Sequence, residues 1–300
     1  PTGFQLPGCR LPFRGVLVLA MSRTNIVLQI NKDLVTGDLQ LPSLPKVTLM
    51  VREAVANPNQ DLSSLAKVVQ TDPAFCGYLV NSANSPLYRG IGELHNVQQA
   101  LSRLGMKTTQ NLAMTYAARS LFKPRNRALS TWLTAIWKQS TLVAALAKVM
   151  AQHSQGFDPD EALLAGLLQD IGMLPLLDKA ARDVALINDA AAVDALLKQH
   201  SARVGAAVLR HWGMAVSFQN VAKHRENWLR EHDGEADLVD LISLARIHSY
   251  IGQPQMQVLP RIHQLPAFRK LELGELGPSL SYRFIEQAGD SIRETQLSLS

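Results

Sequence analysis

The sequence contains little cysteine and little charge. Its 300 residues include only two cysteines, Cys9 and Cys76, which excludes a disulfide scaffold. A thiolate zinc finger is excluded too, since it needs four ligands drawn mostly from cysteine. Two cysteines fit a reducing compartment, and we expect the protein to be cytoplasmic. Charged residues make up 18% and apolar residues 47% of the chain, which excludes a disordered or collagen-like chain and predicts a substantial core.

Long apolar runs are also missing from the sequence. No run approaches the roughly 20 apolar residues that a membrane span requires, so we expect none. The longest early run, residues 15–21, follows Arg10 and Arg14, as in a signal peptide. It lies at the lower limit of the length of a signal-peptide core, and Pro7 and Pro12 interrupt any helix there. We therefore expect residues 1–20 to be an extension or leader outside the fold.

The signatures of common cofactor loops and catalytic nucleophiles are absent from the sequence. There is no Walker-type glycine loop and no strand–GxGxxG–helix unit. There is no Gly-x-Ser-x-Gly elbow for a nucleophilic serine. Cys76 lies beside Phe75 and Tyr78 on an expected helix, and we interpret it as a small apolar side chain of the core.

One segment of the chain is locally basic. The net charge is +5, but 30 basic residues are offset by 25 acidic ones, so charge alone does not indicate a nucleic-acid partner. The locally basic residues are Lys123, Arg125 and Arg127, which a nucleic-acid-binding regulator would use together with Arg103, Lys107 and Arg119. The alternative interpretation is a solvated face and linker.

Beyond residue 40 the sequence pattern predicts helices almost throughout. Apolar residues recur three and four positions apart, and the alternation typical of strands is scarce. Asp72 and Asp158 each precede a proline, which predicts helix starts at those points. We also expect Ser130 and Ser217 to cap helices, and Gly213 to end a helix that begins near residue 194. The expected breaks lie at 41–46, 84–92, 123–130, 154–160 and 252–260.

Three side chains in the second half of the chain are candidates for chemistry. Asp170 lies at the expected C-terminal end of a helix, where a carboxylate is electrostatically unfavourable and so requires a partner. His200 shares a helical face with Leu196 and Val204 and therefore faces the core. His224 has a similar apolar neighbourhood. Each histidine alone is typical of a core position, but both together with Asp170 are consistent with a site.

Several segments together resemble a known family, over about residues 40–250. They are Leu-Pro-Ser-Leu-Pro-Lys-Val at 41–47, Asp-Pro-Ala-Phe at 72–75, Asn-Ser-Ala-Asn-Ser-Pro at 81–86, Ala-Leu-Ser-Arg-Leu-Gly at 100–105, Trp-Lys-Gln-Ser at 137–140, Gly-Leu-Leu-Gln-Asp-Ile-Gly at 166–172, then His200, Val204, Gly205, Ala206, Trp212 and His224. In this order the segments resemble the HDOD domain, the HD-related output domain. HDOD domains are bacterial, all-helical relatives of the HD metal-dependent phosphohydrolases.

The resemblance implies an all-α fold, a two-lobed helical bundle whose C-terminal lobe is HD-like. The polar segment 123–130 contains Pro124 and divides the chain near its middle. We therefore expect an N-terminal lobe at 21–128 and the HD-like lobe at 129–252. We expect an irregular tail at 253–300, with a last short helix near 281–295.

The resemblance also implies a metal site, from which this sequence departs. In HD enzymes histidine and aspartate hold one or two metal ions that activate water against a phosphate ester. Gln139 stands where the first ligand histidine is expected, and Gln169 precedes Asp170 where a His-Asp pair is expected. Arg246 stands where a final aspartate is expected; it would repel a dication and pair with Asp170. A glutamine amide is a weak, neutral metal ligand. The implied site is vestigial, with no catalytic residue and no metal expected; its members are Gln139, Gln169, Asp170, His200, His224 and Arg246.

The function implied by the resemblance is regulatory. We expect a non-catalytic signal-transduction module that binds a signalling protein partner or a small signalling ligand between its lobes. A rival hypothesis is a metal-dependent phosphohydrolase acting on a nucleotide or cyclic dinucleotide, with Asp170, His200 and His224 holding Mn, Fe, Mg or Zn. A second rival is the nucleic-acid-binding regulator, and a third is a purely structural helical scaffold.

Overall fold

The computed structural model describes residues 29, 32, 33, 36, 39–88, 90–124, 127–271 and 289–299. Within these residues every regular element is a helix, which confirms the all-α prediction. The α-helices are α2 (Lys46–Ala56), α3 (Leu62–Val69), α4 (Pro73–Asn84), α5 (Val97–Leu121), α6 (Arg127–Gln152), α7 (Pro159–Leu168), α8 (Met173–Ala180), α9 (Val184–Ile187), α10 (Ala190–His211), α11 (Val216–His224), α12 (Leu238–His248), α13 (Pro266–Lys270) and α15 (Gly289–Leu299). Two 3₁₀ turns, η1 (Pro254–Gln257) and η2 (Ile262–Gln264), precede α13. None of the described helices is both long enough and apolar enough to cross a membrane.

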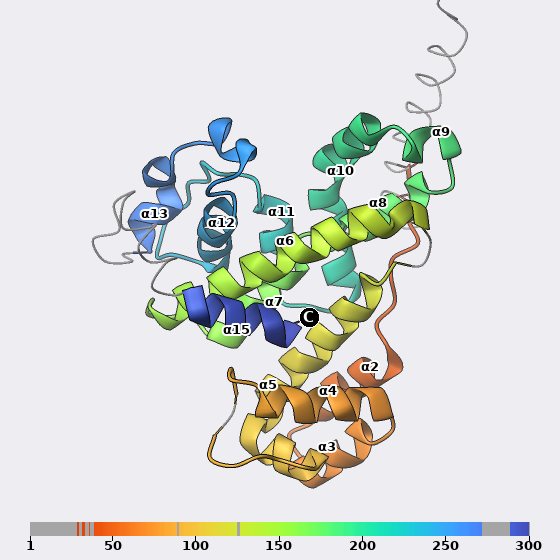
Figure 1. Cartoon of the computed structure of the whole chain (residues 1–300), viewed down its shortest axis with the longest axis vertical. Coiled ribbons are helices and arrows are strands. Elements are labelled where there is room, and N and C mark those ends of the chain that lie inside the picture. Colours follow the sequence, from red (N-terminus) through yellow and green to blue (C-terminus); the bar gives the residue numbers. More distant parts are fainter. Residues whose placement is uncertain are drawn as a thin grey trace, which may run out of the picture.

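The buried apolar side chains form two main cores. The small core lies between α2, α3, α4 and the first part of α5, and includes residues from Val47 to Ala113. The large core begins at Met114 along α5 and includes most of the apolar residues of α6–α13 and Ile292 of α15. Figure 1 shows the two parts, with α2–α4 below and α6–α13 above. The two cores therefore share α5, whose backbone leaves the helical conformation at Gly105 (φ 73°).

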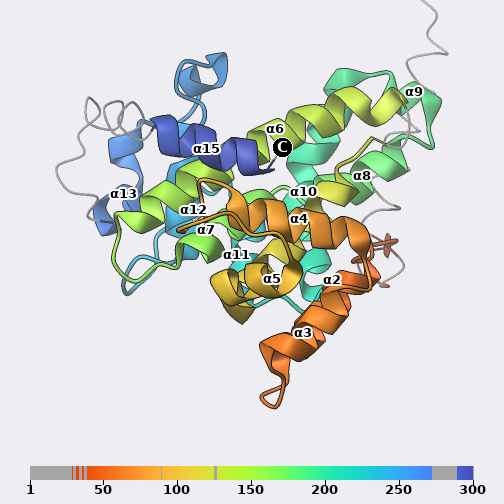
Figure 2. The same cartoon turned by 60° about the horizontal axis from the view of Figure 1, so that its bottom comes forward.

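Several predicted boundaries fall outside what the structure describes. The expected leader at residues 1–20 is not among the described residues, and neither are Cys9 and most of the expected last helix near 281–295. The described C-terminal helix, α15, begins at Gly289 and packs against α6, as both views show (Figures 1 and 2). The expected lobe limits at 128 and 252 stay predictions.

Two predicted helix starts are confirmed. The Asp72 carboxylate accepts a hydrogen bond from the backbone N–H of Phe75 at 3.0 Å, and α4 begins at the next residue, Pro73. The Asp158 carboxylate accepts from the N–H groups of Asp160 and Glu161 at 2.8 and 3.1 Å, where α7 begins. Both aspartates satisfy N–H groups that the first helical turn leaves without partners.

Two other helix starts were predicted wrongly. Ser130 lies inside α6, which begins at Arg127. Leu129 is buried in the large core, so core packing extends the helix beyond the residue that was expected to cap it. Ser217 also lies inside its helix, because α11 begins at Val216 after the extended residue Ala215.

The end of α10 follows the prediction more closely than its start. Gly213 adopts a left-handed conformation (φ 63°) just after the last helical residue, as expected for a glycine at that point. The helix begins at Ala190, earlier than expected, because Asp189 caps it by accepting from the N–H of Ala192.

Close backbone approaches fix the turn between α7 and α8. A Cβ at Gly166 would lie 2.6 Å from the Cα of Ala144, so α7 rests directly on the backbone of α6. A Cβ at Gly172 would collide with the carbonyl oxygen of Ser201 and with the backbone of Gly205 on α10. These glycines therefore hold the α7–α8 turn, which carries Asp170, tightly against α6 and α10.

A polar contact joins the regions around the two cores. The carboxylate of Asp160, at the start of α7, accepts from Lys148 Nζ on α6 at 2.6 Å. It also accepts from the Tyr88 hydroxyl at 2.9 Å and the Thr108 hydroxyl at 3.2 Å, both on the small-core side. The ammonium of Lys148 lies 4.6 Å from the centre of the Tyr88 ring. We call these four residues the Asp160 cluster.

Candidate functional site

Asp170 is held between two arginines in the interior of the molecule. Its side chain is 2% exposed. Arg225, at the end of α11, donates from Nε to Asp170 Oδ1 at 2.6 Å. Arg246 on α12 donates from Nη1 to Oδ2 at 2.8 Å, so the predicted contact between Arg246 and Asp170 is confirmed. Each carboxylate oxygen thus accepts from its own guanidinium, the strongest type of hydrogen bond available to it.

Two further residues complete this group, which we call the Asp170 cluster. Arg225 Nη2 donates to the Ser201 hydroxyl at 2.7 Å. Arg246 Nη2 donates to Glu226 Oε1 at 3.0 Å, and Glu226 is 39% exposed. Two guanidiniums therefore face two carboxylates, and the formal charge of the cluster is zero.

The electrostatics of the cluster keep Asp170 ionised. Burial by itself would raise the pKa of Asp170, but Arg246 and Arg225 outweigh burial and lower that pKa below its ordinary value. Burial likewise acts to lower the pKa of Arg246, and Asp170 reverses this, so the pKa of Arg246 is raised. Asp170 and Arg246 therefore favour each other's charged forms in the interior of the molecule.

The other predicted members of the site do not converge on Asp170 in the same way. Gln139 on α6 donates from Nε2 to the Ser249 hydroxyl at 2.6 Å. Gln169 is 1% exposed, and neither of its amide atoms has a hydrogen-bond partner among the described residues. His200 is buried, as its helical face predicted, and its Nε2 also lacks a partner in the described part of the chain. His224 is half-buried at the end of α11.

Sequence reasoning missed Arg225. It is among the largest fully buried side chains of the described residues, although arginine is normally a surface residue. Arg225 directly follows His224, so the segment was identified from the sequence but the side chain that contacts Asp170 was not. The signal that could have found it was the need of a buried carboxylate for hydrogen-bond donors at both oxygens, since Arg246 donates only to Oδ2 of Asp170.

The residues around Asp170 do not fit the metal ion that the HD relationship implies. Both oxygens of Asp170 already accept from guanidiniums, and Arg225 and Arg246 would repel a dication there. The amide of Gln139 is engaged with Ser249. Within the described residues, Asp170, His200 and His224 do not form a set whose ligand atoms lie within 4.8 Å of one another.

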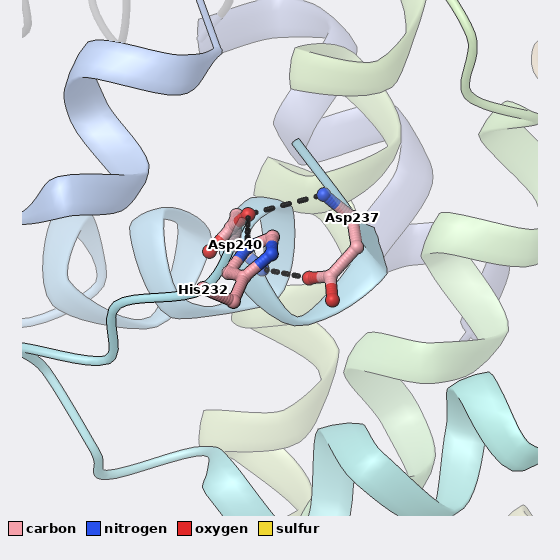
Figure 3. Close-up of side chains that lie close together, drawn as sticks. All are labelled: His232, Asp237 and Asp240. Atoms are coloured by element: carbon pink, nitrogen blue, oxygen red, sulfur yellow. Dashed lines mark hydrogen bonds and ion pairs between the residues drawn. The ribbon is translucent and has the colours of Figure 1, made fainter. Parts of the chain in front are cut away.

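The one such set among the described residues is His232, Asp237 and Asp240, at the start of α12 (Figure 3). His232 Nε2 lies 2.8 Å from Asp240 Oδ2. Asp237 caps α12, and the two aspartates accept from each other's backbone N–H groups. Arg230 forms ion pairs with both aspartates, and Lys270 Nζ lies 3.1 Å from His232 Nε2. Arg230 already pairs with both carboxylates, and Lys270 lies against the imidazole, so this set is the cap of a helix.

The basic residues considered for nucleic-acid binding have different surroundings. Arg103 donates to the carbonyl oxygens of Ala83 and Gly92 at 3.0 and 2.9 Å, which holds the loop after α4. Lys107 is paired with Asp158 at 2.6 Å. The remaining residues are Arg119, which is half-buried, Lys123 and Arg127, which are exposed, and Arg125, which lies outside the described residues. A nucleic-acid surface built from them stays a prediction.

Several solved structures share the fold of this chain. A protein of Shewanella amazonensis SB2B, provisionally named a metal-dependent phosphohydrolase, is 22% identical with a TM-score of 0.78, covering 93% of this chain and 99% of that one. An HDOD domain protein of unknown function from Geobacter sulfurreducens is 18% identical with a TM-score of 0.63, covering 93% and 98%. A provisionally named signal transduction protein of Marinobacter aquaeolei VT8 is 21% identical with a TM-score of 0.59, covering 92% and 66%. At these identities the likeness shows the fold.

Sequence comparison places the chain in a family. It is 20% identical over 237 residues to an uncharacterised protein of Treponema pallidum (strain Nichols). The matched region is 74% of this chain and 45% of that protein, so this chain spans less than half the length of that relative. The family model of the HDOD domain matches residues 41–228, which include Gln139, Asp170 and Arg225. The chain therefore belongs to the HDOD family.

Proposed function

We propose that this chain is a non-catalytic signal-transduction module in which an HD-type metal site has degenerated. In this proposal the module acts in the cytoplasm by binding a protein partner or a small signalling ligand. The single observation that carries the proposal is the pair of guanidiniums on Asp170, which use both of its oxygens at 2.6 and 2.8 Å.

Metal-dependent hydrolysis needs a cation that lowers the pKa of a bound water. Asp170 is the best retained of the expected ligands, but Arg225 and Arg246 take the place that a cation would have beside it. A water at this position would face two N–H donors and no activating metal ion. The cluster therefore lacks the group that generates a nucleophile.

The two glutamines support the same proposal. Gln139 and Gln169 are neutral, and amide oxygens bind transition metals far more weakly than imidazole does. Gln169 is buried, and neither of its amide atoms has a hydrogen-bond partner among the described residues. The name of the Marinobacter aquaeolei relative, a provisional signal transduction protein, is consistent with a signalling role.

The test is metal analysis of the purified full chain, followed by hydrolysis assays on nucleotides and cyclic dinucleotides with Mn²⁺ or Mg²⁺ added. We expect far less than one metal ion per chain and no phosphate release above that of the protein-free buffer. Stoichiometric metal, together with hydrolysis that is lost in Asp170→Ala, would overturn the proposal in favour of a metal-dependent phosphohydrolase. The matched control is Asp194→Ala, which removes an exposed carboxylate paired only with Lys198.

A further inference from the structure

A cavity of about 660 Å³ lies between α4, the end of α5 and α15. One face of α4 forms its longest wall, with Gly77, Asn81, Ser82 and Ser85 among the lining residues. Figures 1 and 2 show α15 on the same side of the molecule as α4. The cavity is separate from the Asp170 cluster, none of whose members lines it. Its volume lies within the range of sites for small molecules, about 300–1,000 Å³.

The α4 wall contains several polar residues, of which Ser85 also donates from its hydroxyl to the carbonyl oxygen of Ser82 at 2.6 Å, at the end of the helix. In the segment 81–86, Ala83 is buried in the small core, and the Asn84 side chain pairs with the backbone of Leu94 at 2.7 and 2.9 Å. These two positions serve packing. Asn81, Ser82 and Ser85 line the cavity. A side-chain amide and hydroxyl groups are thus presented to a concave surface, where they are suited to hydrogen bonding with a ligand.

The opposite end of the cavity combines cations with aromatic rings. Arg119 and Lys123 line it, together with Glu294 of α15, so its described lining residues carry a formal charge of +1. Tyr78 and Tyr116 form an aromatic wall with ring centres 5.5 Å apart. Cations select a phosphate or carboxylate, and tyrosine rings offer a surface on which a flat ring stacks.

We propose that this cavity binds a small phosphate ester carrying a flat ring, of the size and chemistry of a nucleoside monophosphate. The phosphate lies toward Arg119 and Lys123, the ring against the two tyrosines, and the amide and hydroxyl groups of α4 contact the polar edge of the ligand. The inference deepens the proposed function, on which it rests, by naming the chemical class of the signalling ligand. Since α15 supplies one wall, bound ligand would connect α15 to α4.

The test uses calorimetric titration of the full chain with AMP and GMP as probes. We expect at least one of the two nucleotides to bind. Adenosine and inorganic phosphate should bind at least about tenfold more weakly, because adenosine lacks the phosphate and inorganic phosphate lacks the ring. Inorganic phosphate binding as tightly as the nucleotides would overturn the proposal, because the ring would then contribute nothing. Failure of both nucleotides to bind would overturn it as well.

Gly77 provides a matched pair of variants. A Cβ at Gly77 would meet no atom within 4 Å, and the residue is helical, so a larger side chain fits there without strain on the fold. Gly77→Leu places its side chain in the cavity and should weaken nucleotide binding at least about tenfold, whereas Gly77→Ala should leave it within about twofold. Both variants should fold, which thermal unfolding verifies. Unchanged affinity in Gly77→Leu would place the ligand elsewhere and refute the inference.

The outcome for this cavity is separable from the outcome for the proposed function. The nucleotide recovered after titration is analysed for hydrolysis in the presence of Mn²⁺. Both proposals are supported if the wild type binds the nucleotide, Gly77→Leu binds it much more weakly, and the nucleotide is recovered intact. Hydrolysis that depends on Asp170 refutes the non-catalytic module, and the Gly77 variants still decide whether the cavity is the binding site.

Discussion

Among the described residues, the carboxylates of Asp170 and Asp160 are neutralised in different ways. Asp170 is 2% exposed, lies within the large core and accepts from two guanidiniums. Asp160 is 19% exposed, lies between the two cores and accepts from one ammonium and two hydroxyl groups. In the proposed function, the first arrangement takes the place of a metal ion beside an aspartate. The second connects α6 and α7 to α5 and to the loop after α4. An aspartate paired with basic side chains therefore balances charge at Asp170, whereas at Asp160 it links helices that surround different cores.

The largest loss of stability is expected when the charge of Asp170 is removed. Asp170→Asn leaves Arg225 and Arg246 buried with only the half-exposed Glu226 to compensate them, and we expect a loss of about 3–5 kcal/mol in the free energy of unfolding. Urea denaturation measures this loss. The control is Asp194→Asn, whose exposed ion pair with Lys198 should contribute less than about 1 kcal/mol. A loss in Asp170→Asn as small as the loss in the control would contradict the compensated cluster.

A smaller effect is expected at the Asp160 cluster. Lys148→Met removes the ammonium but keeps an apolar stem of similar length, and Asp160 retains the hydroxyl groups of Tyr88 and Thr108. We expect a loss of about 1–3 kcal/mol, again by urea denaturation. Lys107→Met is the matched control, because Lys107 pairs with Asp158 at the same 2.6 Å but is mostly exposed. Equal losses in the two variants would show that burial adds nothing to the Lys148 contact.

The pH dependence of stability distinguishes the carboxylate from the nearby histidines. Burial lowers the pKa of His200 below its ordinary value of 6.5, and the charge of Arg203 acts in the same direction. The unfolded state therefore binds more protons than the folded state below about pH 6.5, so stability falls as the pH decreases from 7. Asp170 affects the pH dependence only in stronger acid. Its pKa is lowered in the folded state, so its ionised carboxylate stabilises the fold above pH 3.8, and this stabilisation is lost as the pH falls through the folded-state pKa.

The measurement is the free energy of unfolding between pH 7.5 and pH 5, in the wild type and in His200→Gln. We expect the variant to show a flatter slope over this range, with a smaller effect on stability than Asp170→Asn or Lys148→Met. Buried His248, whose pKa burial also lowers, accounts for part of the slope that remains. Identical slopes in the two proteins would mean that His200 is not the titrating group.

Helix starts that depend on local chemistry could be predicted from the sequence. Asp72 and Asp158 are each followed by proline, and both act as caps as predicted. Ser130 and Ser217 were equally acceptable caps by residue type, but both lie inside their helices. A side-chain oxygen is compatible with several positions near a helix end, and burial of neighbours such as Leu129 decides between them.

The candidate site was predictable only in part, for a related reason. Family resemblance located Asp170 and Arg246, and the expectation of charge pairing gave their contact correctly. Arg225 lies 55 positions from Asp170, and nothing in its own segment indicates a buried side chain. The partner of a buried charge depends on which helices pack together, and Gly172 and Gly205 set that packing through a close approach that the sequence alone does not reveal.

The most direct test of the central claim is the thermal unfolding midpoint of the purified protein before EDTA dialysis, after it, and after Mn²⁺ is then added. If guanidiniums take the place of the metal beside Asp170, all three midpoints should agree. A midpoint that falls after EDTA and recovers with Mn²⁺ in the wild type, but not in Asp170→Asn, would contradict the account.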